Sequence, residues 1–176
     1  MPLSLHTAAV QPMIAMLGSL PAWLDKAAAE KDEAALIGAS LAPDMYALAR
    51  QVQIASDTAK GMVARVTDGE APAMPDTETN FAELKARCAK TVAYLESVSA
   101  EAFDAGENRE ITITFPNGGG IRFPTAAAYV TGFALPNFYF HMSTAYAILR
   151  KEGVALGKPD FLASLMPFMF APPQPA

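Results

Sequence analysis

Residues 124–153, PTAAAYVTGFALPNFYFHMSTAYAILRKEG, form the stretch that decides the fold. At 100° per residue, one side of a helix over this stretch carries His141 together with Val130, Ala134, Asn137, Phe138, Ala145 and Ile148. The remaining aromatic residues point to other sides, which predicts a helix covered on several faces, in the middle of a bundle or in a subunit contact. Pro136 predicts a kink one turn before His141, and Gly153 predicts the end of the helix.

The composition indicates one domain over residues 1–176 with a large buried fraction or a subunit interface, because 52% of the residues are hydrophobic and only 18% are charged. A net charge of −5 provides no basic surface, so we expect no nucleic-acid binding. The single cysteine suits a reducing cytoplasm. The apolar run near Leu135 is broken by Pro136 and His141, so we expect no membrane span and a cytoplasmic protein.

Three further long helices are predicted, over Leu3–Ala29, over residues 41–69 and over Asn80–Ala102. Pro12 and Pro21 should bend or interrupt the first. The second should begin with Pro43 in its first helical position, and its stripe is Met45, Leu48, Val52, Ala55, Ala59, Met62 and Val66. The opposite side should face water and carries Arg50, Gln53, Asp57 and Lys60. A short helical turn is expected over residues 31–36, ending at Gly38.

The linker GEAPAMPDTET, residues 69–79, is longer than a short antiparallel turn needs. Eleven extended residues reach at most about 36–40 Å, close to the ~39 Å length of a 26-residue helix. The linker therefore either carries the chain back along the bundle, making the second and third helices parallel, or is a plain loop.

The period changes after the third helix. Residues 110–115 alternate apolar and polar side chains, PNGGG follows at 116–120, and IRF begins a second run, which predicts a β-hairpin that must lie on the helices or on another subunit. Residues 163–176 read as an extended tail, in which Phe168 and Phe170 should dock on other parts of the protein. The expected fold is an all-α four-helix bundle with a small β-hairpin between the third and fourth helices.

His141 and Asn137 are the best candidates for a binding site, since side chains at i and i+4 of a helix are neighbours about 5–6 Å apart between Cβ atoms. Two ligands of one metal or substrate need that reach. The alternative is a buried histidine bonded to a core partner. His6 lies on the inward face of the first helix; it either meets His141 across the bundle and shares a metal, or sits half-exposed near the helix start.

Asp44 and Gln51 stand two helical turns apart on one edge of the apolar stripe of the second helix, where polar groups need partners. They line a pocket, or else Asp44 stabilises the helix dipole and Gln51 bonds to backbone. The Tyr146 hydroxyl either donates to a ligand or sits at the rim of the core. Together with His141 and Asn137, these residues make up the expected ligand pocket.

Three blocks carry a family resemblance: LAPDMYALARQVQIASDTAKG at 41–61, LPNFYFHMSTAYAILRKEG at 135–153 and GKPDF at 157–161. In this order they resemble an uncharacterised bacterial domain-of-unknown-function family grouped with the DinB/YfiT-like four-helix proteins. The resemblance covers nearly the whole chain. It implies an up-down-down-up order of helices and a homodimer.

Many members of that superfamily bind a divalent metal, zinc or nickel, through one histidine of the second helix and an HxxxH pair of the fourth, and some activate a low-molecular-weight thiol with it. Here the pair maps to Asn137 and His141, and the second helix offers only Asp44 or Gln51. The resemblance therefore implies a degenerate metal site. Two functions stay open: binding of a small ligand or partner near His141 without catalysis, or metal-dependent thiol transfer with His141, and with Asn137, Asp44 or His6, as ligands.

Overall fold

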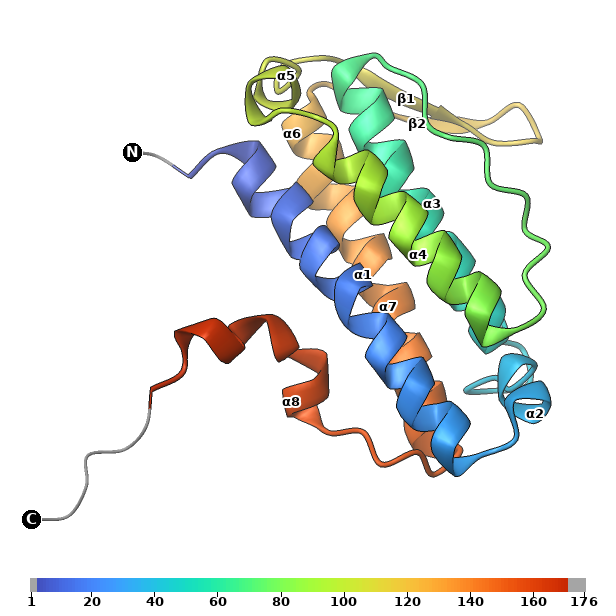
Figure 1. Cartoon of the computed structure of the whole chain (residues 1–176). Helices are drawn as coiled ribbons and strands as arrows, with labels where there is room; N and C mark the ends of the chain where they lie inside the picture. Colours follow the sequence, from blue (N-terminus) through green and yellow to red (C-terminus); the bar gives the residue numbers. More distant parts are fainter. Residues whose placement is uncertain (1–2, 171–176) are drawn as a thin grey trace, which may run out of the picture.

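The structure, a computed structural model, describes residues 3–170 and contains a bundle of four long helices (Figure 1). The long helices are α1 (Leu5–Glu30), α3 (Leu48–Thr67), α4 (Phe81–Glu96) and α7 (Leu135–Lys151). The short helices are α2 (Glu33–Ile37), α5 (Ala100–Asp104), α6 (Ala126–Tyr129), a π-helix (Val130–Ala134), α8 (Lys158–Phe161) and a 3₁₀-helix (Ala163–Phe168). Strands β1 (Ile111–Thr114) and β2 (Gly120–Phe123) form an antiparallel hairpin between α4 and α7, in which Ile111 pairs with Phe123.

The linker between α3 and α4 runs back along the outside of the bundle, so the two helices are parallel (Figure 1). Helix α3 packs against α7 on one side and α4 on the other, and α1 closes the bundle against α4 and α7. The predicted four-helix bundle, its up-down-down-up order and its hairpin are thus confirmed.

Helix α3 begins at Leu48, so the prediction that Pro43 occupies its first turn was wrong. An isolated antiparallel bridge joins Ser40 to Ala47, and the Leu48 amide donates to the Ala39 carbonyl at 2.8 Å. This bridge closes residues 41–46 into a turn on the surface. Asp44 and Tyr46 are therefore exposed residues of a loop and not of a helix.

The third predicted helix also ends early. Helix α4 stops at Glu96, and Ser99 starts the separate helix α5 because its hydroxyl accepts a hydrogen bond from the Ala102 amide at 3.2 Å. A side chain that accepts a hydrogen bond from a backbone amide in this way favours the start of a new helix over continuation of the preceding one.

Three prolines lie within or at the start of the long helices α1 and α7. We expected Pro12 and Pro21 to bend or interrupt helix α1, and the helix continues through both without interruption. Before Pro136 the chain widens into the π-helix, in which the Leu135 amide donates to the Val130 carbonyl five residues back. Because proline lacks an amide hydrogen and its ring crowds the preceding turn, a wider turn accommodates it.

Helix α1 has the length and the mean hydropathy, 1.2 over its most apolar window, that a membrane-spanning helix needs. Half of that window is buried inside the bundle, however, and Met13, Leu17, Leu20 and Trp23 are almost completely covered. A core helix has the same composition, so the packing accounts for the hydropathy of α1.

The hairpin lies on the helices of its own chain. Ile111 is buried, and the Phe123 ring packs against Tyr129 and Phe133 at centroid distances of 5.4 and 6.2 Å. The C-terminal segment, in contrast, is only partly docked. Phe168 and Phe170, which we expected to dock, are 80% and 89% exposed, and residues 171–176 of the predicted tail lie outside the described residues.

Gly106 lies against the end of α3, where a Cβ atom would stand 2.0 Å from the Val66 carbonyl oxygen. Because that neighbour is backbone, Gly106→Ala should destabilise the protein by about 1–3 kcal/mol, as overpacking does. Gly18 in α1 is the control: it is exposed and has open space around a new Cβ, so Gly18→Ala should stabilise by about 0.5–1 kcal/mol. Urea unfolding measures both, and equal effects of the two variants would contradict this packing.

Candidate functional site

His141 lies on the side of α7 that faces α3, with 7% of its surface exposed. Its ring atom Nδ1 stands 2.7 Å from Gln51 Oε1, and the Gln51 amide nitrogen donates to the Tyr46 carbonyl at 2.9 Å. A carbonyl can only accept, so the amide nitrogen of Gln51 must face Tyr46 and its oxygen must face His141. Nδ1 of His141 therefore carries the ring proton.

The other ring nitrogen, Nε2, makes no hydrogen bond within the described chain. Among the described residues, Arg87 Nε is the single fully buried side-chain nitrogen or oxygen that lacks a hydrogen-bond partner, so Nε2 of His141 is not fully buried. Nε2 therefore keeps contact with solvent. A pocket of about 240 Å³ lies at His141, with walls formed by Asp44, Met45, Tyr46, Gln51, Phe140 and His141.

The environment keeps His141 neutral. Burial lowers the pKa of the imidazole below its ordinary value of 6.5, and the nearby Arg50 guanidinium lowers it further. Arg50 in turn lies 6.0 Å from the centre of the Tyr46 ring, at the same end of α3. The pocket thus presents an unprotonated nitrogen acceptor between apolar and aromatic walls, with one carboxylate, that of the exposed Asp44.

Asn137 does not line this pocket. Its amide nitrogen donates to Thr58 Oγ1 at 2.8 Å, and that hydroxyl donates to the Ile54 carbonyl at 2.7 Å. Asn137 therefore ties α7 to α3 as a structural pair. Helical spacing placed Asn137 and His141 on one side correctly, but α3 provides each of them with a separate partner.

Tyr146 and His6 lie elsewhere in the fold. The Tyr146 ring packs against Trp23 and Phe161 at centroid distances of 5.7 and 5.5 Å, where α8 meets α1. The half-buried His6 donates its backbone amide to Asp104 Oδ1 at 2.8 Å, and its ring contacts Phe103. The structure brings together His141, Gln51 and Asp44, and leaves Asn137, Tyr146 and His6 out of the pocket.

The donor set around the pocket does not fit a bound divalent metal. A catalytic zinc site needs three protein ligands. The pocket offers His141 Nε2 and the Asp44 carboxylate, since the Gln51 oxygen is used by His141 Nδ1. Within residues 3–170 no group of three or more His, Cys, Asp and Glu side chains is arranged so that it could hold a metal ion. Cys88 is buried, and burial raises the pKa of its thiol to about 12, so it supplies no thiolate.

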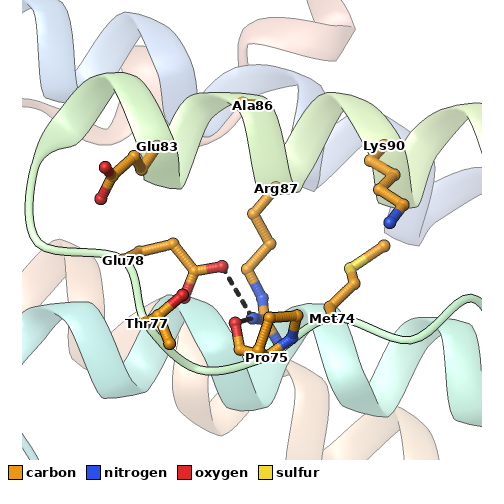
Figure 2. Close-up of a pocket in the computed structure, with 8 residues that line it drawn as sticks. All are labelled: Met74, Pro75, Thr77, Glu78, Glu83, Ala86, Arg87 and Lys90. Carbon is orange, nitrogen blue, oxygen red and sulfur yellow. Dashed lines mark hydrogen bonds and ion pairs between the residues drawn. The ribbon is translucent and has the colours of Figure 1, made fainter.

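Sequence reasoning missed a second site, beneath the linker. Figure 2 shows Arg87 extending from α4 to the linker, where it meets Glu78. Its side chain is 1% exposed and pairs with Glu78 at 2.9 Å, with Asp57 at 2.6 Å and with Asp76 at 3.0 Å. One guanidinium thus joins a carboxylate of α3 and two carboxylates of the linker to α4.

Further contacts fasten the linker along its length. Gln53 of α3 donates to Glu78 at 2.9 Å, and Lys90 of α4 donates to the Ala73 carbonyl at 3.1 Å. A pocket of about 340 Å³ remains between linker and α4, lined by Met74, Pro75, Thr77, Glu78, Glu83, Ala86, Arg87 and Lys90 (Figure 2). The available sequence signal was Arg87 itself, a charge within the apolar stripe of Leu84, Cys88 and Leu95.

We expected the polar side of α3 to face water, and the structure contradicts this expectation. Gln53 is 5% exposed, and Asp57 is paired with both Arg87 and Lys60. The extended linker covers this side. Periodicity distinguishes polar from apolar sides of a helix, but it does not reveal that a linker supplies polar partners there.

The lowered pKa of His141 predicts a pH dependence of folding stability. Below about pH 6.5 the unfolded imidazole binds a proton while the folded one stays neutral until lower pH, so the unfolded state binds more protons and stability falls as pH falls. Replacing His141→Gln should therefore reduce the loss of unfolding free energy between about pH 7.5 and 5.5. His6→Gln, which retains His141, should keep the loss. Identical losses in the wild type and in His141→Gln would contradict the assignment.

Arg87→Met should unfold far more easily than the wild type. Removal of one partner leaves Asp57, Asp76 and Glu78 without their shared cation, and breaking a buried ion pair costs about 3–5 kcal/mol. Lys85→Met is the matched control, since Lys85 pairs with Asp25 at the surface and such pairs contribute at most about 1 kcal/mol. Urea unfolding at neutral pH compares the two. A cost for Arg87→Met as small as that for Lys85→Met would overturn the role of Arg87.

Comparison with known proteins places the chain in a family. Residues 5–162 match the model of the domain of unknown function DUF1993. A crystal structure of a DinB family member protein from Shewanella denitrificans, at 1.83 Å resolution, is similar to the structure with a TM-score of 0.81 and 40% sequence identity, covering 98% of this chain and 95% of that one. None of the curated proteins compared with the chain matches it. The chain therefore belongs to the DUF1993 family of DinB-like domains.

Proposed function

We propose that the protein binds a small molecule in the pocket between the 41–46 turn and α7, and that the ligand donates a hydrogen bond to His141 Nε2. The observation that carries this proposal is the orientation of the imidazole. Gln51 holds the proton on Nδ1, which leaves Nε2 as an acceptor with solvent contact and without a hydrogen-bond partner among residues 3–170. A fixed tautomer of this kind is how proteins aim a histidine at a ligand.

The walls of the pocket indicate the class of ligand. Met45, Tyr46 and Phe140 offer apolar and aromatic surface, with Tyr46 62% and Phe140 55% exposed. Asp44 adds a negative charge and no cation lines the pocket among the described residues. These features favour a ligand with an aromatic or apolar body, an O–H or N–H donor for His141, and either no charge or a positive one.

The competing proposal is metal-dependent thiol transfer. Three protein ligands would be needed, and the pocket contributes two candidate donors, His141 Nε2 and the Asp44 carboxylate. Cys88 lies in the core and does not reach this pocket. Binding of a ligand without a resident metal is therefore the better supported of the two.

The proposal predicts binding of phenol but not of toluene, which has nearly the same shape and no hydroxyl donor. In protein labelled with ¹⁵N-histidine, phenol should shift the Nε2 resonance of His141, while the resonances of His6 serve as an internal control. His141→Phe should remove phenol binding. Equal binding of phenol and toluene, or phenol shifts of His6 alone, would overturn the proposal.

Two further measurements on the same protein test the preferred charge of the ligand and the binding of a metal. Tyramine should bind better than 4-hydroxyphenylacetate, and Asp44→Asn should reduce that preference. A ligand that binds only the folded state must raise the melting temperature. Since we propose that no metal binds here, zinc or nickel should leave the melting temperature unchanged. A rise with zinc that His141→Phe abolishes would favour the metal-dependent alternative.

A further inference from the structure

The pocket between the linker and α4 is lined by four charged side chains, and two of them pair with each other. Arg87 pairs with Glu78 at 2.9 Å, and the second carboxylate oxygen of Glu78 accepts a hydrogen bond from Gln53 at 2.9 Å. Glu83 and Lys90, the other two, form no ion pair within residues 3–170. The pocket therefore retains one carboxylate and one ammonium group that lack a countercharge in the described chain.

Both of these groups are exposed and keep hydrogen-bonding capacity. Oε2 of Glu83 accepts from the Thr79 amide at 2.6 Å, whereas Oε1 makes no hydrogen bond to the part of the chain that the structure describes. The bond from Thr79 lowers the pKa of Glu83, so this carboxylate is ionised at neutral pH. Lys90 Nζ donates to the Ala73 carbonyl at 3.1 Å, which uses one of its three N–H donors.

Arg87 lies between Glu83 and Lys90 along α4 and provides a third unused group (Figure 2). Its terminal nitrogens pair with Asp57, Asp76 and Glu78, but Nε is buried and has no hydrogen-bond partner among the described residues. Figure 2 shows Met74 on the side of Arg87 away from Glu78. Because a methionine side chain is flexible, Met74 can turn aside and admit an acceptor to Nε. Buried N–H groups normally have such an acceptor, so a carbonyl oxygen of a ligand would supply what this one lacks.

The spacing of the charged groups indicates the length of the ligand. Glu83, Arg87 and Lys90 share one side of α4, since residues four and seven positions apart fall on one stripe of a helix. The seven positions from Glu83 to Lys90 correspond to about 10.5 Å along the helix axis. An extended chain of three amino acids spans about 10–11 Å. A tripeptide can therefore reach both ends of the pocket at once, whereas a single amino acid cannot.

We propose that this pocket binds a short zwitterionic peptide of about three residues. Its terminal ammonium group pairs with Glu83, its terminal carboxylate pairs with Lys90, and a backbone carbonyl between them accepts a hydrogen bond from Arg87 Nε. The pocket volume of about 340 Å³ and the apolar surface of Met74, Pro75 and Ala86 suit an extended backbone with small side chains. This site is separate from the pocket at His141 and does not depend on the function proposed for it.

The first test compares peptides that differ at one end, with isothermal titration calorimetry on the full chain. Trialanine should bind. N-acetyltrialanine, which lacks the ammonium group, and trialaninamide, which lacks the carboxylate, should each bind roughly two- to fivefold more weakly, the range that an exposed ion pair provides. Equal affinities for the three peptides, free alanine that binds as well as trialanine, or no binding of trialanine at millimolar concentration would overturn the proposal.

Two variants assign each end of the peptide to its residue. Lys90→Gln should abolish the preference for trialanine over trialaninamide, and Glu83→Gln should abolish the preference over N-acetyltrialanine. Both substitutions remove a charge and retain a hydrogen-bonding group, and the urea midpoint checks that each variant is folded. Lys85→Gln is the matched control, since Lys85 lies on the same helix and pairs with Asp25 outside the pocket, and it should keep both preferences. Full preferences in either pocket variant would contradict the assignment.

The contact with Arg87 has its own readout in protein labelled with ¹⁵N-arginine. The Arg87 Nε–H is buried and is recognised by slow exchange of its proton with water. Trialanine should shift this resonance and leave the Nε–H of the exposed Arg122 unchanged. An Arg87 resonance that does not move when trialanine saturates the protein would show that no carbonyl reaches Nε, and the proposal would then be wrong.

Discussion

Helix α3 buries polar side chains on two sides, and each of them needs a partner because a buried polar group without one costs about 1–3 kcal/mol. On the side of α7, Gln51 meets His141 and Thr58 meets Asn137. On the opposite side Gln53 meets Glu78 of the linker. Asp57 on that side meets Arg87 of α4. The position of α3 is therefore specified by hydrogen bonds as well as by apolar packing.

The same requirement explains why the linker lies flat against the bundle. Without the linker over the α3–α4 seam, Asp57 would be the one carboxylate paired with Arg87 among the described residues, and the linker adds Asp76 and Glu78. A cation so deeply buried is tolerated when several carboxylates surround it. The return of the chain, which makes α3 and α4 parallel, is thus stabilised by the charges it delivers.

Apolar periodicity predicted the four helices because it reports which side of each helix is buried, and the family resemblance supplied their up-down-down-up order. It also indicated that His141 lies on the buried side of its helix and that Gln51 lies at the core boundary. It failed where tertiary contacts decide. The Ser40–Ala47 bridge holds Pro43 in a turn, where we expected the start of a helix. Tyr146 packs between Trp23 and Phe161 of α8. The side of α3 that we expected to face water is covered by a segment without periodicity, which a helical pattern cannot reveal.

Family membership provides the fold, but the chemistry of this chain must be argued from its own pocket. That pocket depends on one hydrogen bond, between Gln51 and His141, which leaves a neutral ring with Nε2 open to a ligand. The most direct test is the ¹⁵N spectrum of the histidine ring in the free protein at neutral pH. The account predicts a protonated Nδ1 and an unprotonated Nε2 for His141, with this preference lost in Gln51→Leu. A protonated Nε2, or a doubly protonated ring, would contradict it.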